Sequence, residues 1–222
     1  MTFLMAAMLV GGLTGLDGTY YESRSGQQEG QGVQKAAAAG KSTMKVHYID
    51  VGQGSAVLVQ SGVHFMLIDG GDSDASSKVV SYLKRQKVKK LDYVVVSHYD
   101  SDHLNGVVGA LNVFKVKRVI APAYTADSRV YESYCNIIAQ KKIATTRPKA
   151  GKKYKLGKAR FTILAPNSSG YVDENNYSIA LKLVNGKNRF VITGDAETES
   201  EYEMVENGQN LSCDVYMAGH HG

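Results

Sequence analysis

Cysteine is almost absent from this chain, whose only two, Cys135 and Cys213, lie far apart. Two cysteines cannot form a disulfide framework, and the lack of a Cys-x-x-Cys pair gives no sign of a cysteine zinc site. A strong excess of charge is lacking too, because 26 basic residues face 21 acidic ones, a net charge of +5. This mild basicity suits an anionic substrate without requiring one. The composition is that of a soluble globular domain.

A long hydrophobic run is also missing. Residues 3–16 are almost wholly apolar or glycine, but the segment is too short to span a bilayer comfortably. Its length matches the apolar region of a signal peptide, although no basic residue precedes it and no clear cleavage site follows it. We interpret residues 1–17 as signal-like or as the clipped end of a longer membrane helix. A docked or disordered apolar tail is the alternative.

Residues 18–43 lack apolar periodicity and are rich in Gly, Gln, Ser and Ala, which predicts a flexible linker before a folded domain over 44–222. Within the domain, apolar runs predict strands at 45–51, 55–60, 63–69, 94–97, 116–121, 152–156, 160–165, 178–184, 190–193 and 214–218. Helical periodicity predicts helices at 74–87, 103–114, 127–141 and 197–206. This order favours a layered α/β fold with mixed sheets and outer helices.

The segment SHYDSDH, residues 97–103, holds four potential metal ligands directly after a predicted buried strand. They are His98, Asp100, Asp102 and His103. Imidazoles and carboxylates crowded at the mouth of a strand are costly unless a cation neutralises the charge and orients the rings. The pattern therefore predicts a divalent metal site, and an ordinary polar loop is the less favoured interpretation.

Two other strand ends carry similar groups. Asp195 follows an apolar strand and a glycine, where it would either bridge two metals or cap the next helix. His220 and His221 follow the last predicted strand. The remaining histidines, His47 and His64, lie inside predicted strands and are expected to pack or face solvent.

The set LIDGG, SHYDSDH, ITGDAE and GHHG, with the opening HYIDVGQGSAVLVQSG, resembles the metallo-β-lactamase fold superfamily. It is most similar to the ComEC-type branch, the hydrolase-like domain of a DNA-uptake membrane protein. The resemblance covers residues 44–222 and implies a four-layer αββα sandwich. Because the family continues beyond the last motif, the resemblance also implies that the domain is truncated at its C-terminal end.

The resemblance implies a dinuclear centre of zinc or manganese ions. His98 and Asp100 would bind one ion, and Asp102 and His103 the other, together with His220 or His221. Asp195 would bridge the ions, and the early acid Asp69 would order the site.

Two departures from the family pattern bear on this centre. Asp100 stands where the superfamily commonly has histidine, a swap that favours harder cations such as Mn²⁺ beside Zn²⁺. No histidine lies between His103 and Asp195, so one ion is expected to be weakly held. If a single ion binds, we expect it at Asp102 and His103.

We expect a metal-dependent phosphodiesterase or nuclease that acts on single-stranded DNA or another phosphodiester, outside the cytoplasm, either secreted or attached to the outer face of a membrane. Asp102 or Asp195 would orient the attacking hydroxide, and the histidine of the 220–221 pair that does not bind metal, which is His221 if His220 is the ligand, would protonate the leaving group. The basic stretches 84–90 and 147–160 would steer a polyanion, unless they are solvated surface charge. The alternatives are a secreted esterase, of the phosphocholine esterase or lactonase type, and a degenerate, non-catalytic domain that binds nucleic acid or a partner.

Overall fold

The computed structural model describes residues 20–23 and 43–220. The apolar segment 1–17, His221 and most of the predicted linker lie outside the described residues. One part of that linker is described, and it differs from the prediction: Tyr20–Ser23 forms strand β1, which pairs antiparallel with β2 (Met44–Tyr48). Backbone pairing along an open sheet edge needs no apolar pattern, and this strand therefore has no signature in the sequence.

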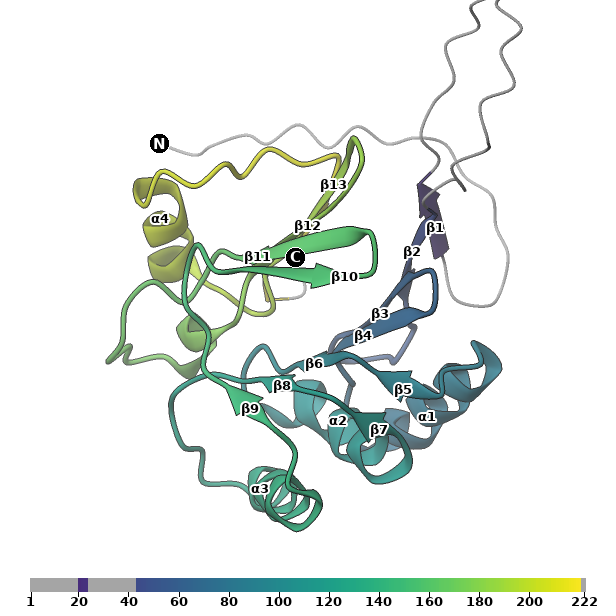
Figure 1. Ribbon diagram of the computed structural model, residues 1–222. Helices are drawn as coiled ribbons and strands as arrows, with labels where there is room; N and C mark the ends of the chain where they lie inside the picture. The colour runs from purple at the N-terminus through teal and green to yellow at the C-terminus, as the bar shows by residue number, and fades with distance from the viewer. Residues whose placement is uncertain (1–19, 24–42, 221–222) are drawn as a thin grey trace, which may run out of the picture.

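The first sheet has seven strands in the order β1-β2-β3-β4-β6-β8-β9 (Figure 1). After β2, its strands are β3 (Ala56–Ser61), β4 (His64–Asp69), β6 (Tyr93–Val95), β8 (Val119–Ile120) and β9 (Thr145–Thr146). Strands β1 to β4 are antiparallel neighbours, whereas β4, β6, β8 and β9 run parallel. The carboxyl ends of β4 and β6 therefore lie side by side at one edge.

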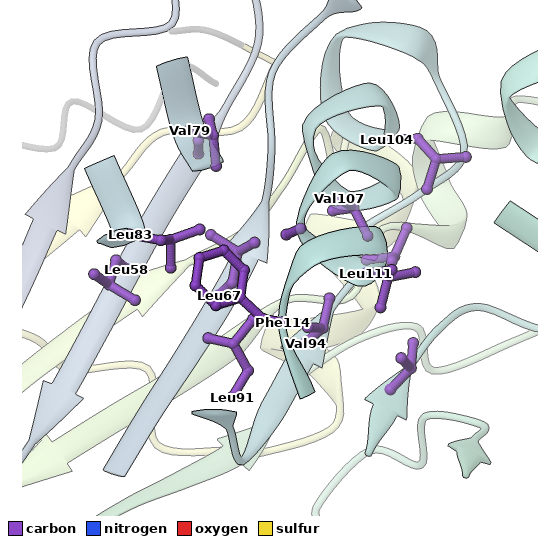
Figure 2. Close-up of a cluster of buried hydrophobic side chains, with 14 of the residues drawn as sticks. Leu58, Leu67, Val79, Leu83, Leu91, Val94, Leu104, Val107, Leu111 and Phe114 are labelled. Carbon is purple, nitrogen blue, oxygen red and sulfur yellow. The ribbon is translucent and has the colours of Figure 1, made fainter. Parts of the chain in front are cut away.

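Three helices connect the parallel strands and cover one face of this sheet. They are α1 (Ser76–Arg85), α2 (Ser101–Val113) and α3 (Arg129–Lys141), with a 3-10 turn η1 (Ser73–Ala75) before α1. Figure 2 shows Leu58, Leu67 and Val94 of the sheet packed against leucines and valines of α1 and α2. Burial of these side chains fixes the helices on the sheet.

A second sheet has five strands in the order β10-β11-β12-β13-β14. They are β10 (Lys153–Leu156), β11 (Ala159–Ile163), β12 (Leu181–Asn185), β13 (Asn188–Ile192) and β14 (Val215–Met217). One face packs on the first sheet through a core that includes Met66, Phe161 and Leu181. The other face carries α4 (Thr198–Glu206), whose Met204 packs on Leu164 and Val191. The predicted four-layer αββα sandwich is confirmed (Figure 1).

The strands of the first sheet are apolar on both faces because both faces are covered. In β3, Val57 and Val59 point to the second sheet, whereas Leu58 points to the helices. In β6, Val94 and Val95 divide in the same way. A period of two in side-chain direction, with apolar residues at every position, gives the continuous hydrophobic runs that the sequence displays.

Several element bounds differ from those expected. The strand predicted at 116–121 is two short strands in different sheets, because β7 (Lys115–Val116) pairs with β5 (Lys90–Leu91) and β8 belongs to the first sheet. Helix α2 begins at Ser101, two residues earlier than predicted. A 3-10 turn η2 (Glu174–Tyr177) precedes β12. Among the described residues, no helix has the length and apolar character needed to cross a membrane.

Candidate metal centre

The candidate site lies where the carboxyl ends of β4, β6 and β13 meet between the two sheets. Asp69 is the last residue of β4, Ser97 and His98 follow β6, and Asp195 follows β13. Helix α2 begins at the same place and contributes His103 from its first turn. The ends of neighbouring parallel strands converge at one edge of a sheet, which is why groups distant in the sequence meet here.

Asp69 is fully buried and accepts three hydrogen bonds. Its Oδ1 accepts from the Ser97 backbone N at 2.7 Å, and its Oδ2 accepts from Ser97 Oγ at 2.7 Å. The same Oδ2 lies 3.0 Å from His103 Nδ1. An ionised carboxylate is an acceptor only, so the His103 proton at this bond is on Nδ1. Asp69 therefore turns the Nε2 edge of His103 toward the site, as a carboxylate behind a metal-ligating histidine does.

Ser97 gives His98 its orientation. The single hydroxyl proton of Ser97 is donated to Asp69, so the Ser97 Oγ accepts from His98 Nδ1 at 3.0 Å. The Nε2 of His98 then carries a lone pair. This atom is buried and makes no hydrogen bond within the described part of the chain; Asp100 Oδ2 is 3.6 Å away. A buried imidazole nitrogen of this kind fits a metal ligand, because leaving it without a hydrogen-bond partner costs about 1–3 kcal/mol.

Three buried groups are close enough to share a cation. One ligand atom from each of His98, His103 and Asp195 lies within 4.8 Å of the other two. The His103 Nε2 is 3.2 Å from Asp195 Oδ1 and 3.8 Å from Asp102 Oδ2. Two imidazoles with surrounding carboxylates form a donor set suited to zinc or manganese, so the residues present fit the metal that the sequence implies.

The same contacts shift the pKa values of the ionisable groups in the site. Burial by itself lowers the pKa of His103, but hydrogen bonds to Asp195 and Asp69 outweigh it and raise the pKa to about 10. The nearby His98 imidazole lowers the pKa of Asp100, although burial opposes the shift. Without a cation, the site is thus held together by a protonated His103 between two carboxylates.

Two glycines allow the loops to approach closely enough to build the site. Gly54 has φ +99°, and a Cβ at this position would lie 1.9 Å from the backbone O of Asp102. Gly194 has φ +58°, and its Cβ would lie 2.6 Å from Ser97 Cβ. No other residue fits at either position without moving a neighbouring loop.

His220 is placed at the rim of the site. Its side chain is exposed, and its Nδ1 lies 3.0 Å from Oε1 of Glu197, which also accepts from Asn175 Nδ2 at 3.1 Å. When His220 donates its Nδ1 proton in a hydrogen bond to Glu197, the lone pair of the imidazole is on Nε2, the tautomer that a metal ligand needs. The structure thus brings His98, Asp100, Asp102, His103 and Asp195 together and places His220 beside Glu197.

Four residues of the site were not identified from the sequence. Ser97 orients His98, and Gln53 Nε2 donates to Asp102 Oδ2 at 3.4 Å. Ser178 Oγ accepts from the Asp195 backbone N at 3.0 Å, and Glu197 holds His220. Ser97 and Gln53 lie inside quoted motifs, so their position was a usable signal. Glu197 likewise ends the quoted motif ITGDAE, whereas Ser178 lies outside every quoted motif.

Comparison with known proteins places this geometry in a family. Residues 49–217 match the model described as metallo-beta-lactamase superfamily. The chain belongs to this superfamily. A relative of this metallo-β-lactamase domain, ComE operon protein 3 of Bacillus subtilis (strain 168), is 28% identical over 198 residues, which cover 80% of this chain and 25% of that protein. Competence protein ComA of Neisseria gonorrhoeae is 31% identical over 175 residues, or 78% of this chain and 23% of that protein.

These relatives confirm the similarity to the ComEC-type branch, and the chain spans about a quarter of their length. Among solved structures, a metallo-β-lactamase of Cronobacter sakazakii, described as HARLDQ motif mutant S60, superposes with a TM-score of 0.57 at 13% identity. That match covers 78% of this chain and 74% of the other, and at this identity it shows the fold alone.

Proposed function

We propose that this domain is a metal-dependent phosphodiesterase that cleaves DNA. The observation that carries the proposal is the buried cluster of His98, His103 and Asp195, in which His98 Nε2 makes no hydrogen bond to any described residue and lies 3.6 Å from Asp100 Oδ2. Divalent cations in such a site lower the pKa of water and neutralise charge on a phosphodiester.

The chain supplies ligands in two groups. His98 and Asp100 would hold one ion, and Asp102 and His103 the other, with Asp195 between them. Asp69 and Ser97 keep the imidazole Nε2 atoms pointed at the ions, so the rings do not reorient when a cation binds. The carboxylate of Asp102, one-fifth exposed, would orient a water molecule for attack. His220, exposed and held by Glu197, would complete the second ion's ligands.

The choice of DNA rests on two observations. The first is a relative named as a competence protein, and competence is uptake of DNA. The second is a charge pattern: residues 133–172 contain nine lysines and arginines and no acidic residue. Between residues 149 and 160 the exposed cations are Lys149, Lys152, Lys153, Lys155, Lys158 and Arg160. A basic surface without acidic interruption attracts the phosphate backbone of a nucleic acid.

The decisive assay incubates the purified protein with Mn²⁺ or Zn²⁺ and single-stranded DNA, a small phosphodiester, or a lactone. We expect DNA and the small phosphodiester to be hydrolysed, and Asp195→Asn to abolish both activities while the protein stays folded. Bound metal in elemental analysis with hydrolysis of the lactone only would assign the chain to the esterases and refute the proposal.

A second candidate is a non-catalytic domain that binds nucleic acid. It is favoured by one departure from the family pattern, the lack of any histidine between His103 and Asp195. Incomplete ligation predicts weak metal binding. DNA binding that weakens steeply with salt, without turnover under either metal, is the outcome that this candidate predicts. An extracytoplasmic location, either secreted or attached to the outer face of a membrane, remains part of our proposal for both candidates.

A further inference from the structure

Behind the metal-binding loop lies a cavity of about 330 Å³ between α3 and strand β9. Three tyrosine rings, one guanidinium, a hydroxyl and small side chains line it, among them Tyr99, Tyr131, Tyr134, Ala139, Thr145 and Arg147. Tyr99 and Tyr134 are buried and form its floor, whereas Ala139 and Arg147 are exposed at its mouth. Its volume is within the range of pockets that hold small ligands.

The cavity adjoins the metal-binding loop through the backbone of Tyr99, the residue between His98 and Asp100, whose side chain lines the cavity. Its backbone N donates to the Tyr124 hydroxyl at 2.8 Å, and its own hydroxyl donates to the Pro122 carbonyl at 3.0 Å. These two bonds fix the ring of Tyr99 in the wall. A group bound against this ring therefore contacts the residue that joins two predicted metal ligands in the chain.

The lining favours one kind of occupant. The Tyr99 ring lies 4.5 Å from the Tyr131 ring and 5.8 Å from the Tyr134 ring, so the three rings pack on one another and form one aromatic surface against which a flat ring can stack. Arg147, which donates to the same Pro122 carbonyl, places a cation at the mouth. Arg147 lies in the acid-free run over 133–172, so no neighbouring residue along the chain neutralises it. Aromatic walls with a cation at the rim match a base joined to a phosphate.

We propose that this cavity binds one base of a single-stranded nucleic acid, with Arg147 on an adjacent phosphate, and so positions the strand at the metal-binding loop. The inference rests on the proposed function, which it deepens by assigning the substrate's aromatic contact. Stacking on tyrosine tolerates any base, because every base has a π-face. The cavity therefore selects nucleic acid over small esters without reading sequence.

Binding is measured with a single-stranded trinucleotide carrying 2-aminopurine, added to the full chain in the presence of a chelator so that cleavage does not interfere. The chain contains no tryptophan, so the fluorescence of the probe is read without interference. Ala139→Phe fills the mouth from an exposed helix position, and Gln140→Phe, also exposed but not lining the cavity, is the matched control. Tyr131→Leu is a second variant that removes one ring while keeping an apolar side chain.

We expect quenching of the probe by the unaltered chain, roughly tenfold weaker binding by Ala139→Phe and Tyr131→Leu, and unchanged binding by Gln140→Phe. A trinucleotide with an abasic site should bind the unaltered chain as weakly as the normal probe binds Ala139→Phe. Equal affinity for the normal and abasic probes, or no effect of either cavity variant, overturns the proposal.

The two proposals fail in different ways. If the domain is not a phosphodiesterase, base-dependent quenching persists in the unaltered chain and in Asp195→Asn, but no DNA is cleaved under Mn²⁺ or Zn²⁺. If the cavity does not bind a base, DNA is cleaved with the same KM by the unaltered chain, Ala139→Phe and Gln140→Phe.

Discussion

Asp69 Oδ2 lies 3.0 Å from His103 Nδ1, and both side chains are buried at the end of adjacent elements. The pair joins β4 to the first turn of α2 and at the same time sets the tautomer of a predicted metal ligand. The fold and the site therefore both depend on this carboxylate. A variant that lacks it shows the two roles separately, as a loss of stability and as a loss of metal affinity.

Asp69→Asn is the sharpest replacement, because asparagine tolerates the φ of +56° at this position. Its single amide oxygen cannot accept all three hydrogen bonds now made to Asp69. Its NH₂ group would face one of the three donors, with which it cannot form a hydrogen bond. We expect about 2–3 kcal/mol lower stability to denaturant and metal affinity reduced roughly 10–100-fold. Calorimetric titration with Zn²⁺ measures the affinity.

The control for this variant is Asp50→Asn, since Asp50 is exposed and its contacts, a bond from the Gly52 backbone N and an ion pair with Lys78 at 3.5 Å, lie on the surface. It should leave both quantities unchanged. Unaltered zinc affinity in Asp69→Asn would show that the Asp69–His103 bond does not organise the centre.

The layers of the fold were predictable because the strands of the first sheet are covered on both faces and display continuous apolar runs. The cluster of His98, His103 and Asp195 was predictable for a related reason: each follows an apolar strand, and strand ends converge. Both predictions rest on the types of side chain that follow one another along a segment, and this order can be seen directly in a single sequence.

The roles of other site residues depend on contacts across the fold, and these roles have no local signature even where the residue lies in a motif. The hydroxyl of Ser97 matters only because Asp69 takes its proton, and Glu197 matters only because His220 lies beside it. The early start of α2 is local instead, since the backbone N of His103 and Leu104 already bond to Asp100 O. Short strands such as β9 are held by their neighbours rather than by their own composition.

Gly54→Ala tests whether close backbone approach builds the site. A Cβ there would lie 1.9 Å from Asp102 O, whereas a Cβ at Gly52 would meet nothing within 4 Å. Both glycines have positive φ, so both alanine variants carry a strain of about 1–2 kcal/mol. We expect Gly54→Ala to be about 2 kcal/mol less stable than Gly52→Ala, because Asp102 and the start of α2 must move.

Urea unfolding of the two variants measures this difference, and zinc titration shows whether the displaced Asp102 also weakens metal binding. Equal stability of the two variants would mean that the loop at Gly54 yields without disturbing α2.

Metal binding itself should be visible as stabilisation. A cation present at 100 times its Kd stabilises the folded state by about 2.7 kcal/mol. For a domain of this size we expect Tm to rise by roughly 5–10 °C when Mn²⁺ or Zn²⁺ is added. Differential scanning calorimetry checks the shift, and a chelator should reverse it.

The matched pair for that experiment is His98→Ala and His64→Ala. His98 offers a buried Nε2 to the cation, whereas His64 is part-exposed and its Nδ1 pairs with Asp92. The metal-dependent rise in Tm should shrink in His98→Ala and persist in His64→Ala. A full rise in both variants would place the bound ion elsewhere.

Glu197→Gln tests the predicted role of His220. The glutamate carboxylate holds His220 Nδ1 at 3.0 Å, and the His220 and Glu197 side chains are 54% and 32% exposed, so the substitution should leave the fold intact. If His220 completes the second ion's ligands, loss of the charge behind it weakens one of two binding steps roughly tenfold and leaves the other unchanged. Glu199→Gln, exposed on the same helix, is the control. Two unchanged binding steps in Glu197→Gln would remove His220 from the ligand set, and the same titration of His221→Ala would then decide between the two histidines.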